Sequence, residues 1–247
     1  MYEISYAGAP VPVREDIEAA HRLAWQRLAR PGTWWSGAQR VAIAAEARNA
    51  HRCPLCRERK AALSPYAVRG EHASLGALPQ NVVEVIHRIR TDSGRLTQAW
   101  QQGMIASGLS EEQYVETVGV LVTTVAIDTF TRAIGMPQHP LPAPEPGEPS
   151  RRRPRGAKPG GAWLPWVELA DMTAEEAGLY VPGEAFSNVR RAMSLVPAEV
   201  IGFFGIVEAQ YLPGPAMRDF DREYRAITHP QIELIASRVS AINGCVF

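Results

Sequence analysis

The sequence has little that would tie it to a membrane, a secretory pathway or a charged polymer. Basic and acidic side chains balance at 26 each, so no net charge attracts nucleic acid or an anionic membrane. No apolar run approaches the roughly 20 residues that span a bilayer. The N-terminus lacks the basic segment and apolar stretch of a secretory signal. We therefore expect a cytoplasmic protein whose partners include neither nucleic acid nor membrane.

Cysteine is also scarce. Three cysteines, an odd number, do not make the disulfide framework of a small secreted domain. The chain shows no phosphate-binding glycine loop, no nucleophile-elbow serine motif and no zinc-protease helix. We therefore expect any catalytic residues to include the cysteines. These are Cys53 and Cys56, in a Cys-x-x-Cys pair, and Cys245.

Apolar residues repeat at helical spacing along most of the 247 residues, which predicts an all-α bundle. Ser36-x-x-Gln39 and Ser110-x-x-Gln113 have the form of capping boxes and each predicts the start of a helix. The segment 110–134 is long and mostly apolar, so we expect it to cross the centre of the core. The predicted helices are 14–29, 36 to the Cys53 region, 79–91, 95–107, 110–134, 185–195, 197–211 and 230–245.

Eight prolines between 137 and 159 forbid regular helix and predict an extended connector. This divides the chain into an N-terminal helical half (1–135), a Pro/Arg-rich linker (136–160) and a C-terminal helical half (161–247). Within the linker a basic run could grip phosphate or an acidic partner. Pinning to acidic groups on the protein's own surface is the favoured interpretation, because no aromatic residues interleave with the charges. The run consists of Arg151, Arg152, Arg153, Arg155 and Lys158.

The Cys53–Cys56 pair is suited to peroxide chemistry. One thiolate can attack an oxidant, and the other thiol can close a disulfide on the resulting sulfenic acid. Glu46 stands seven residues before Cys53, on the same face of an unbroken helix, where it could relay a proton. Pro54 fits the first turn of a new helix whose dipole would lower a thiol pKa. Positive charge near the thiolate is expected from His51, Arg52, Arg57 and Lys60.

Two simpler interpretations of these residues stay open. Cys53 and Cys56 could bind a structural zinc ion together with His51 and His72, since Cys-x-x-Cys is half of many zinc motifs. Alternatively the cysteines are inert and pack in a core, and Glu46 is a solvated helix residue. His72, His87 and His139 have no evident partner and are expected to be structural or surface residues.

The C-terminal segment shows a family resemblance. Glu233, eleven further residues and Cys245 reproduce the first half of a motif that runs Glu, eleven residues, Cys, two residues, Cys, three residues, His. Residues 229–245 resemble the helix that leads into the redox dithiol of the alkylhydroperoxidase D (AhpD-like, carboxymuconolactone decarboxylase) superfamily. Residues 108–135 are more loosely similar to the long helix beside that dithiol.

The resemblance implies an all-α, AhpD-like helical bundle that forms homo-oligomers. Members reduce peroxides through a cysteine pair assisted by Glu and His, or use the scaffold for decarboxylation. By this resemblance Glu233 would be a proton relay and Cys245 a resolving cysteine. The sequence ends one residue short of the second cysteine, and we expect a recoded selenocysteine codon to follow Phe247, with a histidine codon four positions later; the alternative is a natural terminus or an arbitrary truncation.

The two halves are hypothesised to be distant copies of one unit. When Cys53 is placed on Cys245, Ile43 falls on Ile235, although Val41 falls where Glu233 stands.

We therefore predict a thiol-dependent peroxidase or disulfide reductase in which Cys56 attacks and Cys53 resolves, following the order in the family. No cofactor or metal is required, and the expected partners are a peroxide substrate and a thiol electron donor. The alternative is a non-enzymatic helical module with a structural zinc ion or an inert cysteine pair.

Overall fold

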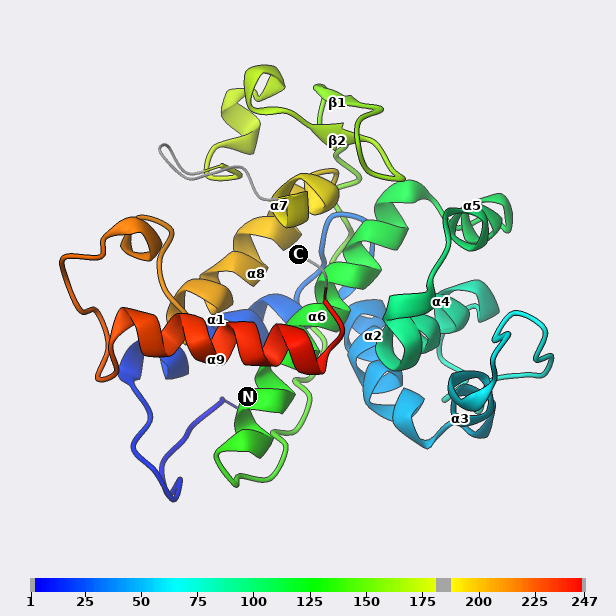
Figure 1. The fold of residues 1–247 in the computed structure, drawn as a ribbon. Helices are drawn as coiled ribbons and strands as arrows, with labels where there is room; N and C mark the ends of the chain where they lie inside the picture. Colours follow the sequence, from blue (N-terminus) through cyan, green and yellow to red (C-terminus); the bar gives the residue numbers. More distant parts are fainter. Residues whose placement is uncertain (1–2, 181–187, 246–247) are drawn as a thin grey trace.

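The structure, a computed structural model, describes residues 3–180 and 188–245 and is mostly helical (Figure 1). The described α-helices are α1 (Glu15–Ala29), α2 (Gly37–Asn49), α3 (Pro54–Ala61), α4 (Gln80–Asp92), α5 (Gln98–Ala106), α6 (Glu111–Ala133), α7 (Asn188–Met193), α8 (Pro197–Gln210) and α9 (His229–Ile242). Short 3-10 turns lie at η1 (Ala50–Arg52), η2 (Ser93–Arg95), η3 (Leu169–Asp171), η4 (Ala174–Glu176) and η5 (Ala216–Arg218). Strands β1 (Ala157–Lys158) and β2 (Trp166–Val167) pair antiparallel. The predicted helical character is confirmed; the start of the predicted helix 185–195 lies outside the described residues.

Local sequence signals explain where the main helices begin. The side chain of Ser36 accepts a hydrogen bond from the backbone of Gln39, whose side chain bonds back to Ser36. Ser110 and Gln113 form the same reciprocal pair at the start of α6, as predicted. Each box satisfies amide groups that the first helical turn leaves without a partner.

Helix α6 is the centre of the fold, as its apolar length predicted. It packs against α1, α2, α4 and α8, and Val120, Leu121 and Ile127 are buried along it. Gly119 allows α8 to approach closely, because a Cβ at this position would lie 2.6 Å from the Cβ of Glu199.

Of the described helices, α6 alone is long and apolar enough to cross a membrane by length and composition. The expectation that no segment approaches that length is therefore wrong. However, 61% of its apolar stretch is buried inside the protein, and core helices commonly pass this test.

The two predicted halves contribute to one hydrophobic core. Trp25 and Ile43 from the N-terminal half belong to the same buried cluster as Leu195 and Ile206 from the C-terminal half. Helix α8 packs on both α1 and α6. The predicted halves thus share a core, while their origin as copies of one unit stays a hypothesis.

The proline-rich segment forms no helix between 136 and 154, as its prolines predicted, and it is hydrogen-bonded to the N-terminal helices. The backbone amide of Glu145 donates to the carbonyl of Ala29 over 2.7 Å, and Trp25 Nε1 donates to the carbonyl of Pro140 over 2.8 Å. Three of its five basic side chains pair with acidic groups of the same chain. These pairs are Arg152 with Glu175, Arg153 with Glu111 and Glu112, and Lys158 with Asp171. The structure therefore agrees with the favoured interpretation of the basic run.

Helix α9 lies at the outside of the molecule (Figure 1). Its buried residues are His229 and Ile232, whereas Leu234 and Ile242 are 70% and 68% exposed. Helix α2, which was aligned with it, is in contrast built into the core through Ile43, a residue that is completely buried.

A buried ion-pair cluster joins three helices near Gly119. Arg40 on α2 pairs with Glu116 on α6 and, over 2.7 Å, with Glu199 on α8. Glu116 also accepts a hydrogen bond of 2.5 Å from the backbone amide of Trp34. All three charged side chains are at most 6% exposed, so their charges depend on one another for stabilisation.

Replacement of Arg40 by Met should leave two buried carboxylates without a cation. We expect the free energy of unfolding to fall by about 3–5 kcal/mol in urea denaturation at neutral pH. Lys158→Met, which breaks an exposed pair, should cost far less than Arg40→Met. Equal losses in the two variants would show that the buried cluster does not hold the helices together.

Candidate functional site

The cysteine pair lies at the start of α3. Cys53 is the residue before the first helical turn, Pro54 occupies the first helical position and Cys56 lies within that turn. Pro54 is favoured there because the first turn has no use for its missing amide hydrogen. The sequence prediction for Pro54 is confirmed. Helix α2 ends before the pair and the 3-10 turn η1 bridges the gap.

Two histidines from other elements meet the sulfurs. His72, on the loop between α3 and α4, places Nδ1 3.5 Å from both Cys53 Sγ and Cys56 Sγ. His87, on α4, places Nδ1 3.2 Å from Cys56 Sγ. The four donor atoms all lie within 4.8 Å of one another. We call Cys53, Cys56, His72 and His87 the Cys–His cluster.

Each histidine has a carboxylate on its other ring nitrogen. His87 Nε2 lies 2.8 Å from Oε1 of Glu46, and His72 Nε2 lies 2.7 Å from Oε2 of Glu84. Glu84 is also paired with Arg59 on α3 over 2.8 Å. A carboxylate at Nε2 fixes the ring so that Nδ1 faces the sulfur atoms.

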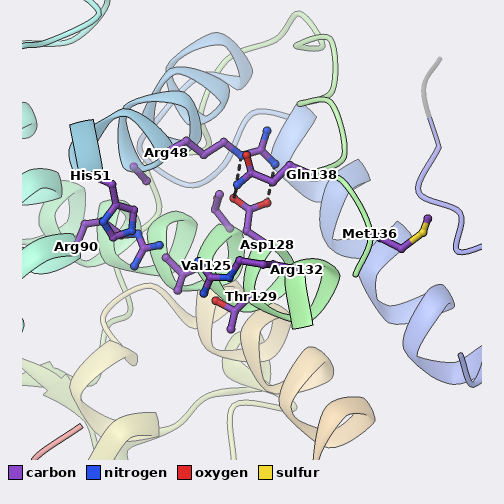
Figure 2. A pocket seen from close by; sticks show the side chains of 11 residues that line it. Arg48, His51, Arg90, Val125, Asp128, Thr129, Arg132, Met136 and Gln138 are labelled. Atoms are coloured by element: carbon purple, nitrogen blue, oxygen red, sulfur yellow. Dashed lines mark hydrogen bonds and ion pairs between the residues drawn. The ribbon is translucent and has the colours of Figure 1, made fainter. Parts of the chain in front are cut away.

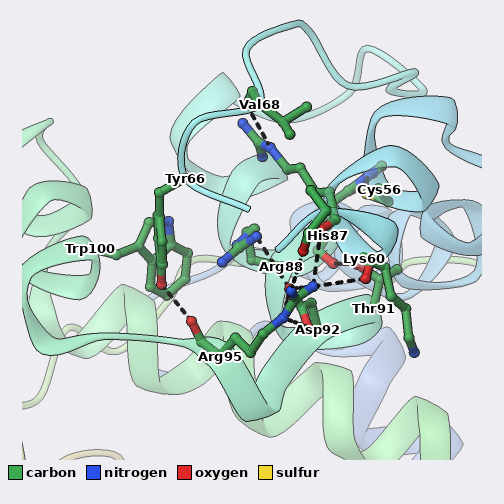
Figure 3. Close-up of polar contacts among 12 residues, drawn as sticks. Cys56, Lys60, Tyr66, Val68, His87, Arg88, Thr91, Asp92, Arg95 and Trp100 are labelled. Atoms are coloured by element: carbon green, nitrogen blue, oxygen red, sulfur yellow. Dashed lines mark hydrogen bonds and ion pairs between the residues drawn. The ribbon is translucent and has the colours of Figure 1, made fainter. Parts of the chain in front are cut away.

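Arg95 holds α3 against α4 (Figure 3). Its guanidinium donates to the carbonyls of Ala62, Arg59 and Lys60 at the end of α3, over 2.7–3.0 Å. Asp92 at the end of α4 accepts from Arg95 Nε over 2.9 Å. A cation on the last carbonyls of a helix is favourable. This contact fixes the position of Cys56 relative to His87.

The surroundings favour the charged forms of the cluster. Burial opposes ionisation of Cys56, but hydrogen bonds from His72 and His87 outweigh it and lower the pKa of the thiol to about 6. Burial likewise disfavours imidazolium, yet bonds to Cys56 and Glu84 raise the pKa of His72 to about 10. Despite burial, hydrogen bonds from His72 and Arg59 lower the pKa of Glu84 to about 2.

His87 and Glu46 are shifted in the same sense. The pKa of His87 is raised, since its bonds to Cys56 and Glu46 outweigh its burial. The pKa of Glu46 is lowered, although burial opposes this, by bonds from Asn49 and His87. These shifts favour the thiolate form of Cys56 and the protonated forms of His72 and His87.

The structure brings together some of the predicted site residues and separates others. Cys53 and Cys56 lie together in the cluster, whereas Glu46 reaches it only through the hydrogen bond to His87 and not along an unbroken helix. The zinc interpretation named His51 and His72 as the two histidine ligands. His72 does lie beside the cysteines, but the second histidine there is His87 and not His51.

The charge that stabilises the thiolate also comes from a different source than predicted. Arg52, Arg57 and Lys60 make no hydrogen bond to either sulfur among the described residues, and His72 and His87 supply the donors.

Glu233 and Cys245 lie outside the Cys–His cluster. Glu233, on α9, accepts a hydrogen bond of 2.5 Å from the Tyr211 hydroxyl. Cys245 follows α9 and is exposed. Helices α9 and α3 lie well apart in Figure 1.

Sequence reasoning missed His87, Glu84 and Arg59. His87 was expected to be structural, but it is completely buried on α4 beside Val83 and Ile86. A histidine on the apolar face of an amphipathic helix was the available signal, because a buried imidazole requires polar partners. Glu84, three residues earlier on the same helix, offered a second signal.

The chain matches no protein-family model, no curated protein and no solved structure in the comparisons made.

The thiolate state of Cys56 can be titrated through its ultraviolet absorbance in a Cys245→Ser background. We expect a transition near pH 6, and Glu46→Gln should move it toward the ordinary thiol value of about 8.5, because His87 loses the carboxylate that keeps it charged. Glu71→Gln, an exposed carboxylate on the same loop as His72, should leave the transition in place. A Glu46→Gln curve that overlays the parent would disprove the coupling of Glu46 to the thiolate.

Proposed function

We propose that this chain is a thiol-dependent peroxidase of the AhpD-like type, with Cys56 as the attacking residue. The observation that carries the proposal is the pair of histidine donors on the Cys56 sulfur, each backed by a carboxylate. A thiolate is the nucleophile in peroxide reduction, and a neighbouring imidazolium both stabilises it and holds a proton for the leaving group. Cys53, whose sulfur lies within 4.8 Å of the other donor atoms, is the resolving residue.

The reaction would proceed in two steps. The Cys56 thiolate attacks the outer oxygen of a hydroperoxide, the O–O bond breaks, and the alkoxide takes a proton from His72 or His87. Cys56 is then a sulfenic acid and the substrate has become an alcohol. Next, the sulfur of Cys53 attacks the Cys56 sulfur, a disulfide forms, and hydroxide leaves as water after taking a proton. An external thiol donor returns both cysteines to the reduced state by exchange.

Substrate access requires movement at the His72 loop. Cys53 is fully buried and Cys56 is 3% exposed. Of the four cluster residues, His72 alone lies on a loop rather than within or beside a helix end. Outward movement of this loop would uncover Cys56 while His87, on α4, stays in place.

The two cysteines should respond differently to substitution. Cys56→Ser should reduce consumption of an alkyl hydroperoxide to the rate in buffer, because the nucleophile is removed. Cys53→Ser should leave a sulfenic acid on Cys56, detectable by a dimedone adduct in peptide mass spectrometry. Glu71→Gln is the matched control and should keep full activity. Unchanged peroxide consumption in Cys56→Ser would rule out this assignment.

A second candidate function is supported by a separate observation. A tetrahedral zinc site with Zn–S of about 2.3 Å and Zn–N of about 2.0–2.1 Å has S···N separations of about 3.5 Å. Three of the four S···N distances in the Cys–His cluster are 3.5, 3.5 and 3.2 Å, and the fourth, from Cys53 to His87, is within 4.8 Å. Carboxylates behind both histidines are typical of zinc ligands, and burial of both cysteines suits a closed structural site.

Metal content separates the two functions. If the cluster is a zinc site, protein purified without chelator should contain one zinc per chain, its thiols should resist peroxide, and His87→Ala should lose the metal. Chelation should then lower the melting temperature, since zinc binding contributes to folding. If the cluster is a redox site, the protein should be free of zinc and should lose two titratable thiols per chain on treatment with peroxide. Stoichiometric zinc with unreactive thiols would overturn the peroxidase proposal.

A further inference from the structure

A second polar site lies behind η1, in a cavity of 290 Å³ between α2, α4 and α6 (Figure 2). Its polar lining residues come from four segments: the end of α2 with η1, the end of α4, the second half of α6, and the segment after α6. They are Arg48, His51, Arg90, Thr124, Asp128, Thr129, Arg132 and Gln138. None of these residues belongs to the Cys–His cluster.

On one side of this cavity, the charges of Arg48 and Asp128 balance each other. Arg48 donates to both carboxylate oxygens of Asp128, over 2.9 and 2.7 Å. Gln138 donates to the same carboxylate over 2.8 Å. Figure 2 shows these three side chains joined in one group. The charge of Arg48 is therefore balanced, and Asp128 has its acceptors occupied.

The other side carries positive charge without a bonded anion. The side chains of Arg90 and Arg132 make no hydrogen bond or ion pair among the residues that the structure describes, and no carboxylate besides Asp128 lines the cavity. Burial lowers the pKa of Arg90; the nearby Asp128 opposes this, and Arg132 adds a smaller lowering effect, so the two guanidiniums lie close enough to repel each other. Positive charges held together at a cavity in this way are stabilised by a bound anion.

We propose that this cavity binds a small phosphate-bearing molecule between Arg90 and Arg132. Guanidinium groups present paired N–H donors that match phosphate oxygens. Thr129 adds a hydroxyl at the same wall, and an imidazole on His51 can donate one further hydrogen bond. The volume of 290 Å³ lies at the lower end of small-molecule sites, which limits the ligand to inorganic phosphate or a short phosphate ester. The inference does not depend on the redox proposal.

The test is a calorimetric titration of the full chain at constant ionic strength, with inorganic phosphate, glycerol phosphate and succinate as probes. Saturable binding of either phosphate probe, weakened at least tenfold by Arg90→Gln and by Arg132→Gln, is the expected result. Arg155→Gln removes the same charge from the exposed linker and should bind like the unaltered protein.

Thermal melting gives a second measurement on the same proteins. The Arg132 side chain is exposed and makes no ion pair among the described residues, so Arg132→Gln should not lower the melting temperature without ligand. Saturating phosphate should raise the melting temperature of the unaltered protein and not that of the variants. Arg132 is exposed, so Arg132→Gln carries the test alone if Arg90→Gln fails to fold. Absence of saturable phosphate binding, equal affinity in the arginine variants, or tighter binding of succinate than of phosphate would overturn the proposal.

Discussion

The carboxylate of Glu46 is the contact on which the Cys–His cluster depends. It is 1% exposed and accepts four hydrogen bonds: from His87 on α4, from Asn49 on its own helix, and from Ser74 and Leu75 on the His72 loop. A buried carboxylate is costly unless its oxygens are satisfied, so these donors keep Glu46 charged. In return Glu46 fixes both histidine-bearing segments to α2, and α6 holds α2 and α4 in the core.

The same arrangement is compatible with proton chemistry and with metal binding, and the reason is geometric. Glu46 and Glu84 engage the Nε2 atoms, so the Nδ1 atoms of His87 and His72 face the sulfurs. In the redox state, protons on Nδ1 fill the space between nitrogen and sulfur and keep Cys56 ionised. In a zinc site a cation would fill that space, and the same nitrogens would lose their protons. Access to the sulfur therefore distinguishes the functions, since a peroxidase must open the His72 loop and a structural metal must not.

The features of the fold and the site that could be predicted from the sequence are those set by residues close together in the chain. Capping boxes at Ser36 and Ser110 and the position of Pro54 are local signals, and they fixed the helix starts well. Glu46 was predicted from its spacing to Cys53 on an unbroken helix, but α2 ends at Asn49, and Glu46 reaches the cluster through His87 instead. His72 and His87 contact Cys56 although they stand 16 and 31 residues after it in the sequence. The helical repeat of apolar residues gives no information on such a contact. His51 was preferred because it is close in sequence, although the turn at η1 directs it to a different cavity.

Histidines 51 and 87 show how the environment decides the role of a residue type. His51 lies in η1 and His87 on α4. For both imidazoles, burial is the largest single influence on the pKa, and it acts to lower it. At His87 the hydrogen bonds to Cys56 and Glu46 outweigh this effect, so the pKa of the ring is raised and its charged form is favoured. At His51 the neighbours are Arg90, Arg132 and Lys60, which add to the effect of burial and keep the ring neutral. The electrostatic potential therefore differs on the two sides of this region. His87 faces the protein's own anions, Glu46 and the Cys56 thiolate, whereas His51 faces the cations Arg90 and Arg132, where we propose that an external anion binds.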